Sequence, residues 1–118
     1  MLTDAVLLGE IASPTFKEVD RIRLVVDRFR ENGLEDPEID DHGNASAVLN
    51  GTEGRSSILV MAHADSVFDS NIQHVMNVGP DEITGPGIAD NAIGLATVVA
   101  LPKLLNTLGI KFKDDVIF

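Results

Sequence analysis

Two short segments of the sequence carry side chains that could bind a metal ion. His63 and Asp65 follow the apolar run of residues 58–62, and Asp90 follows the turn at residues 85–87. An imidazole and a carboxylate are ligands of Zn²⁺, and a second carboxylate can fix the tautomer and tilt of the imidazole. Structural roles compete with this interpretation, because a carboxylate at a helix N-terminus can be a cap and a histidine at a strand end can be a packing residue.

Helices are expected to flank these segments. Residues 2–13 are typical of a short helix, and Thr15 with Glu18 fits a capping box for a second helix that ends near Asn32 and Gly33. The predicted apolar stripe of this second helix consists of Val19, Ile22, Val25, Val26 and Phe29. The predicted solvated face consists of Lys17, Asp20, Arg21, Arg28 and Glu31.

The remaining pattern is typical of strands and one further helix. Residues 44–50 alternate, and residues 56–62 form a short apolar run that indicates a strand buried on both faces. Residues 78–87 suggest a small hairpin, and residues 92–108 a long helix that Pro102 should kink or shorten. A last strand is expected within residues 111–118.

This order of helices and strands predicts an α/β fold. In such folds, ligand sites lie beyond the carboxyl ends of the sheet strands. His63 and Asp65 lie at the carboxyl end of the apolar run and, two residues apart in an extended segment, point to the same side. Asp90, at the front of the next helix, could approach the same rim of the sheet. We therefore expect one imidazole and two carboxylates to meet there.

Composition excludes several other classes of function. The chain has 118 residues, nineteen acidic and nine basic, and a formal net charge of −10 spread along its length, so a nucleic-acid partner is not expected. There is no cysteine, so disulfides and thiolate metal sites are excluded. The N-terminus has no basic leader and no apolar run approaches the roughly 18 residues of a membrane span, so we expect no membrane partner and a cytoplasmic location.

Together the two segments resemble the paired signatures of the M20 family (M20/M25/M40) of zinc metallopeptidases and amidohydrolases. In that family an apolar strand ends in H-x-D, and a G-x-G-x-x-D-[DN] turn opens a helix with small residues. The matching positions here are His63, Asp65, Gly85, Gly87, Asp90, Asn91 and Gly94. The resemblance extends more faintly to residues 13–22 and to "DDHGNASAVLNG" at residues 40–51, so nearly the whole chain finds a counterpart.

The resemblance implies a fold, a cofactor and residue roles. The chain would be the N-terminal part, residues 1–118, of a three-layer α/β/α zinc-exopeptidase-like catalytic domain with a mixed sheet, truncated after the third main strand. His63 would ligate the first zinc, Asp65 would orient the imidazole, and Asp90 would bridge two zinc ions and precede a cis peptide bond. Co²⁺ and Mn²⁺ are alternative ions. The substrate would be a peptide or an N-acyl amino acid.

The same resemblance implies that other parts of the site are missing. The family's general-base Glu, its remaining ligands and its lid domain lie beyond the last residue, so we expect a fragment that is inactive alone and could be completed by a C-terminal chain. Asp114, Asp115, His42, His74 and Glu82 are not assigned to catalysis. Two alternatives stay open: an anion-binding module that uses the helix N-terminus, and an interaction protein that uses its final strand as an exposed edge.

Overall fold

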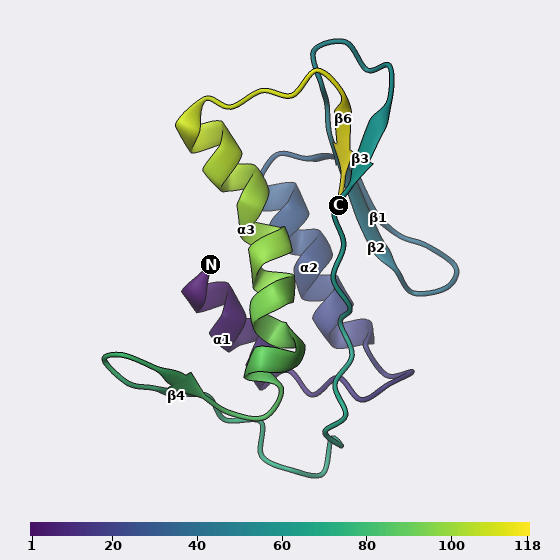
Figure 1. Ribbon diagram of the computed structural model, residues 1–118. Coiled ribbons are helices and arrows are strands. Elements are labelled where there is room, and N and C mark those ends of the chain that lie inside the picture. Colours follow the sequence, from purple (N-terminus) through teal and green to yellow (C-terminus); the bar gives the residue numbers. More distant parts are fainter.

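The computed structural model describes all residues, 1–118, as a mixed sheet with helices packed on one side of it (Figure 1). The helices are α1 (Leu2–Glu10), α2 (Val19–Glu31) and α3 (Ile93–Leu108), and a distorted helical turn, η1 (Ile88–Ala92), precedes α3. The strands are β1 (Glu35–Ile39), β2 (Ala45–Leu49), β3 (Ser57–Leu59), β4 (Asn77–Val78), β5 (Ile83–Thr84) and β6 (Asp115–Ile117). Strands β4 and β5 form the predicted small hairpin.

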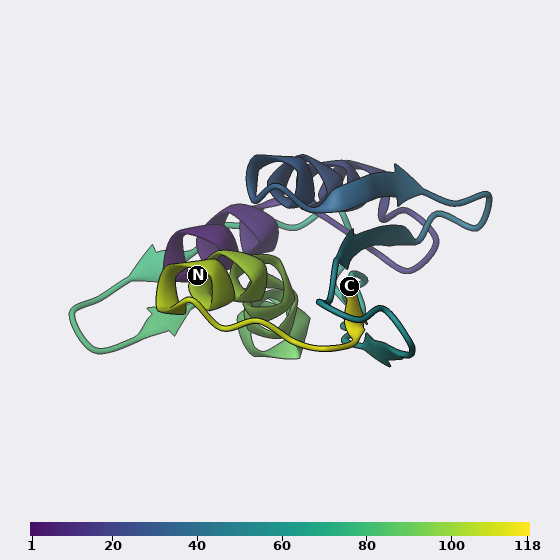
Figure 2. The ribbon, with the colours of Figure 1, turned by 90° about the horizontal axis from the view of Figure 1, so that it is seen from above.

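The main sheet has the strand order β1-β2-β6-β3, in which only β3 and β6 are parallel. Helix α3 forms the connection between these two parallel strands. Seen from above, α1, α2 and α3 all lie on the same side of the sheet (Figure 2). This arrangement confirms the predicted α/β class with a mixed sheet, and residues 1–118 supply the sheet and one helical layer.

The hydrophobic core lies between the sheet and the helices. Val116 and Phe118 are buried beside Ala47, and the ring of Phe29 on α2 lies 6.2 Å from that of Phe118. Four residues of the predicted stripe of α2 are buried, whereas Val19, at the first turn, is 55% exposed. The helix ends as predicted, with Asn32 as its cap and Gly33 in the left-handed conformation.

Two expectations about strands are wrong. The run at residues 56–62 forms only a short strand, β3, and its three residues are exposed. The reason is that β3 is an edge strand and no helix covers the outer face of the sheet, where Leu59 and Met61 are 63% and 77% exposed. The final strand, β6, is not an edge, because it lies between β2 and β3.

Helix α3 covers almost the whole of the predicted range, residues 92–108, and Pro102 does not shorten it. Pro102 is buried within it, and the helix continues past this residue to Leu108. Residues Ile88–Thr107, within η1 and α3, have the length and the mean hydropathy, 1.5, of a membrane span. The expectation that no such run exists is therefore wrong. The buried residues of α3 pack against α1, α2 and the sheet, as those of a core helix do.

Candidate metal centre

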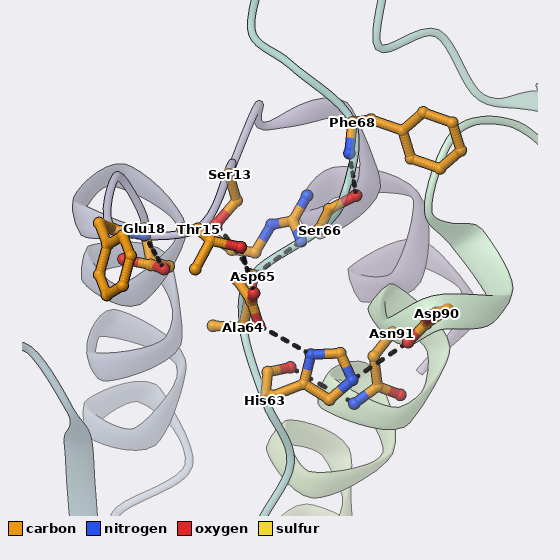
Figure 3. Close-up of polar contacts among 12 residues, drawn as sticks. Ser13, Thr15, Glu18, His63, Ala64, Asp65, Ser66, Phe68, Asp90 and Asn91 are labelled. Carbon is orange, nitrogen blue, oxygen red and sulfur yellow. Dashed lines mark hydrogen bonds and ion pairs between the residues drawn. The ribbon is translucent and has the colours of Figure 1, made fainter.

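The three predicted residues meet at one edge of the sheet. His63 and Asp65 lie in the irregular segment that continues β3, and Asp90 lies in η1. The Nδ1 atom of His63 is 3.0 Å from Oδ1 of Asp65, and its Nε2 atom is 3.1 Å from Oδ1 of Asp90 (Figure 3). The imidazole therefore lies between two carboxylates, with one ring nitrogen facing each.

A distorted helical turn presents Asp90 to the imidazole. Gly87 has φ of 72°, which a residue with a side chain rarely adopts, and a Cβ there would also meet the Ser66 hydroxyl at 2.9 Å. Asp90 and Asn91 have non-helical backbone angles, and the peptide bond between them is cis, as the resemblance implied. The Asn91 amide donates a hydrogen bond of 3.3 Å to the His63 carbonyl, which ties η1 to the other segment.

Asp65 is held on both of its oxygens. Oδ1 faces His63, and Oδ2 accepts a hydrogen bond of 2.7 Å from the Thr15 hydroxyl. The bond from Thr15, followed by the contact with His63, holds the pKa of the Asp65 carboxyl below its ordinary value, although partial burial acts in the opposite direction. The carboxylate is thus ionised at neutral pH and can accept a hydrogen bond from the imidazole Nδ1–H.

The predicted capping box at Thr15 is not formed. Helix α2 begins at Val19, no side chain caps it, and Glu18 instead accepts a hydrogen bond from the backbone N–H of Phe16. The Thr15 hydroxyl bonds with Asp65 instead of capping the helix. Because Asp65 lies 50 residues away in the sequence, the local capping pattern could not reveal this bond.

The prediction of a solvated Arg21 is also wrong. Its side chain is 1% exposed and donates hydrogen bonds to the carbonyls of Ala64, at 2.8 Å, and Ile11, at 2.6 Å. Burial lowers the pKa of the guanidinium, and the negative charge of Asp65 partly opposes this effect. Ala64 lies between His63 and Asp65 in the sequence, so Arg21 stabilises the backbone that carries both candidate site residues. The sequence analysis missed this role.

The chemistry of this donor set fits a divalent metal in part. Two atoms that share one Zn²⁺, with bonds of about 2.0–2.2 Å, lie roughly 3.0–3.6 Å apart, and the separation of His63 Nε2 and Asp90 Oδ1 is 3.1 Å. The Asp65 carboxylate faces Nδ1 of His63, and zinc-binding histidines usually have a carboxylate bonded to their second ring nitrogen in this way. No group of three or more His, Asp or Glu side chains in the chain could hold one ion. His63 and Asp90 thus amount to two ligands of a site that needs more.

Other acidic residues and histidines lie outside this cluster. Asp115 accepts a hydrogen bond from the backbone of Gly51, and His74 bonds with the carbonyl of Asp69. His42 lies in the turn between β1 and β2. A groove of about 660 Å³ adjoins His63 and Asp65 and is lined largely by apolar residues of α2, β2 and the segment after β3.

Three solved structures that share this fold are peptidases. The chain aligns over 99% of its length with aminopeptidase PepT from Bacillus cereus (TM-score 0.80, 21% identity) and with YXEP from Bacillus subtilis, a dinuclear metal-binding peptidase of the M20 family (TM-score 0.73, 20% identity). The yeast dipeptidase Dug1p aligns over 98% of the chain with a TM-score of 0.78 and 10% identity. The chain spans about a third of the length of these structures, from 30% to 34%.

Sequence comparison gives the family directly. No curated protein sequence matches the chain significantly. The sequence model of peptidase family M28 matches residues 44–118, which include both segments of the candidate site. The zinc-peptidase-like fold that the motifs predicted is thus present, with M28 as the matching family model and an M20 peptidase among the structural neighbours. Because the match covers more than half of the chain, the chain belongs to peptidase family M28.

Proposed function

We propose that this chain supplies part of the active site of a metal-dependent hydrolase that cleaves peptide or N-acyl amide bonds through two zinc ions. The observation that carries the proposal is the position of His63, with Nε2 facing Asp90 Oδ1 at 3.1 Å and Nδ1 facing the Asp65 carboxylate. Membership of a peptidase family and a fold shared with peptidases support it. The H-x-D and G-x-G-x-x-D-N motifs favour an M20-type arrangement of this site.

Each residue has a distinct role in the proposal. His63 would hold one ion through its Nε2 lone pair, while Asp65 would accept a hydrogen bond from Nδ1–H and fix the ring. Asp90 would hold the same ion and, because its Oδ2 makes no hydrogen bond or ion pair within the chain, would also be available to a second ion. Zinc bound there would supply Lewis-acid polarisation of the scissile carbonyl and activation of water. Co²⁺ or Mn²⁺ could replace it.

We propose that these 118 residues form the N-terminal portion of a catalytic domain and that other residues supply the remaining ligands and the general base. Three or four protein ligands are normal for catalytic zinc, and this chain brings two together. We propose that the isolated chain is inactive and that a complementary C-terminal polypeptide would complete it. A cytoplasmic location is part of the same proposal.

The anion-binding alternative is not favoured by the geometry. In such a module, an anion would approach the backbone N–H groups at the start of the helix before α3. The Asp90 carboxylate occupies the first turn of η1, is 76% exposed and would repel an anion there. The same negative charge is what a cation site requires.

Calorimetric titration of the chain with Zn²⁺ tests the metal site. We expect one binding event that becomes at least about tenfold weaker in His63→Ala and in Asp90→Ala. His42→Ala is the matched control, because His42 is an exposed histidine in the turn between β1 and β2. The zinc affinity of this variant should equal that of the wild type. Absence of binding by the folded wild type, or binding that survives both site variants, would contradict the proposal.

A hydrolysis assay tests the proposed incompleteness. With zinc present, the isolated chain should cleave dipeptides, tripeptides and N-acyl amino acids no faster than the His63→Ala variant does. Turnover that is lost in the variant would show that these residues suffice for catalysis. It would contradict the proposed inactivity while supporting the metal-dependent hydrolase.

A further inference from the structure

The buried polar residues of this chain are gathered at one place. Ser13, Arg21 and Ser66 are the only polar or charged residues that are buried, with exposures of 0%, 1% and 4%. Ser13 and Arg21 both donate hydrogen bonds to the carbonyl of Ala64, at 2.9 and 2.8 Å. Buried polar groups are costly unless paired, so their concentration around the His63–Asp65 segment indicates a specific structural requirement there.

These bonds fasten the connector between α1 and α2 to the candidate metal centre. Pro14 and Ser66 form a parallel bridge in which the Ser66 N–H donates to the Ser13 carbonyl at 2.8 Å. Arg21 spans the same junction, because its second terminal nitrogen donates to the carbonyl of Ile11 at 2.6 Å. The backbone on either side of Thr15 is thereby held against residues 64–66.

The Thr15 hydroxyl uses this fixed position to bond with Asp65. It donates to Oδ2 at 2.7 Å, while Oδ1 of the same carboxylate faces His63 Nδ1 at 3.0 Å (Figure 3). A carboxylate turns easily about its last torsion, and one bond to His63 would leave that rotation free. A second bond on the other oxygen fixes the plane of the carboxylate and, through it, the plane of the imidazole.

We propose that Thr15 is a positioning residue of the metal centre, which orients His63 by fixing the Asp65 carboxylate. This inference rests on the proposed function, since it assigns the oriented imidazole to a metal ion. Thr15 touches neither the ion nor a substrate in this arrangement and acts only through Asp65. Its side chain is exposed, so removal of the hydroxyl should leave the fold intact.

The test compares Thr15→Val with Thr15→Ser and with a control, Thr107→Val. Valine keeps the branched shape and removes the hydroxyl, and serine restores it. Thr107 is an exposed threonine on α3 whose hydroxyl bonds only within its own helix, to the carbonyl of Lys103. Thr15→Ser and Thr107→Val should unfold within about 2 °C of the wild type, and Thr15→Val, which loses an exposed hydrogen bond to a carboxylate, no more than about 8 °C below it.

Two readouts separate positioning from a merely structural role. In the zinc-free chain, the His63 Nδ1–H resonance should be protected from water in the wild type, Thr15→Ser and Thr107→Val, and should exchange rapidly in Thr15→Val. Zinc affinity should fall about three- to tenfold in Thr15→Val alone. Equal protection or equal zinc affinity in Thr15→Val and Thr107→Val would overturn the proposal.

Failure of the proposed function would be seen separately. If the wild type bound no zinc, the metal-site proposal would fail, yet the Nδ1–H resonance of the zinc-free chain would still decide the role of Thr15. Rapid exchange in Thr15→Val would support Thr15 as the residue that orients the His63–Asp65 pair, and unchanged protection would overturn it.

Discussion

Replacement of Arg21 by methionine should destabilise the fold far more than its position on an apparently polar helix face suggests. The guanidinium makes two hydrogen bonds to backbone carbonyls, at 2.8 and 2.6 Å, and the side chain is 1% exposed. Hydrogen bonds to charged groups contribute about 1.5–3 kcal/mol each, so about 3–6 kcal/mol is lost in the two bonds.

Part of that loss is offset in the variant. Methionine fills much of the same space without the cost of burying a charge, and the Ala64 carbonyl keeps its bond from Ser13. The carbonyl of Ile11 loses its bond from Arg21. We therefore expect the free energy of unfolding to fall by about 2–4 kcal/mol, which for a chain of this length lowers the melting temperature by about 8–16 °C.

Urea and thermal denaturation followed by circular dichroism measure this effect. Arg23→Met is the matched control, because Arg23 lies on the same helix, is 68% exposed and pairs only with the exposed Asp20. Its free energy of unfolding should change by less than about 0.5 kcal/mol. Equal stabilities of the Arg21 and Arg23 variants would refute the conclusion that Arg21 anchors the segment beneath the site.

Further predictions concern the core, a turn and two glycines. Phe29→Ala should lower the free energy of unfolding by about 3–5 kcal/mol in urea titrations, because the ring is buried against Phe118. Hydrogen bonds from Asn44, and more weakly from the backbone of His42, lower the pKa of Asp40 from its ordinary 3.8. Asp40→Asn should therefore lower the free energy of unfolding at pH 7. The difference in this free energy between variant and wild type should vanish as the pH falls through the lowered pKa. Gly33→Ala and Gly87→Ala both place a side chain at φ near +70°, costing about 1–2 kcal/mol, and Gly87→Ala should melt lower because its Cβ also meets the Ser66 hydroxyl.

The approach of His63, Asp65 and Asp90 could be predicted because it follows from rules of strand order. Both segments come after strands or turns at the same end of an α/β layer, and an H-x-D triplet in an extended segment points its two side chains to one side. The cis bond after Asp90 came only from the family resemblance. Nothing in the composition or spacing of those residues would have indicated it.

The supports of the site could not be predicted because their partners are remote backbone atoms. Arg21 bonds with carbonyls at positions 11 and 64, and Thr15 with a carboxylate at position 65. One signal was available, since Arg21 lies four residues before the buried Val25 and so on the buried side of the helix. The exposure of β3 likewise depends on which elements cover the sheet, and hydrophobicity alone does not reveal that.

The most direct test of the metal site is NMR of the histidine side chains during a Zn²⁺ titration of the ¹⁵N-labelled chain. The sequence has three histidines, His42, His63 and His74, so each can be followed separately. We predict that the Nε2 resonance of His63 shifts at the lowest zinc concentration, with Nδ1 still protonated, while the other two histidines do not change. Shifts of His42 or His74 before His63, or of all three together, would contradict a site formed by His63 and Asp90.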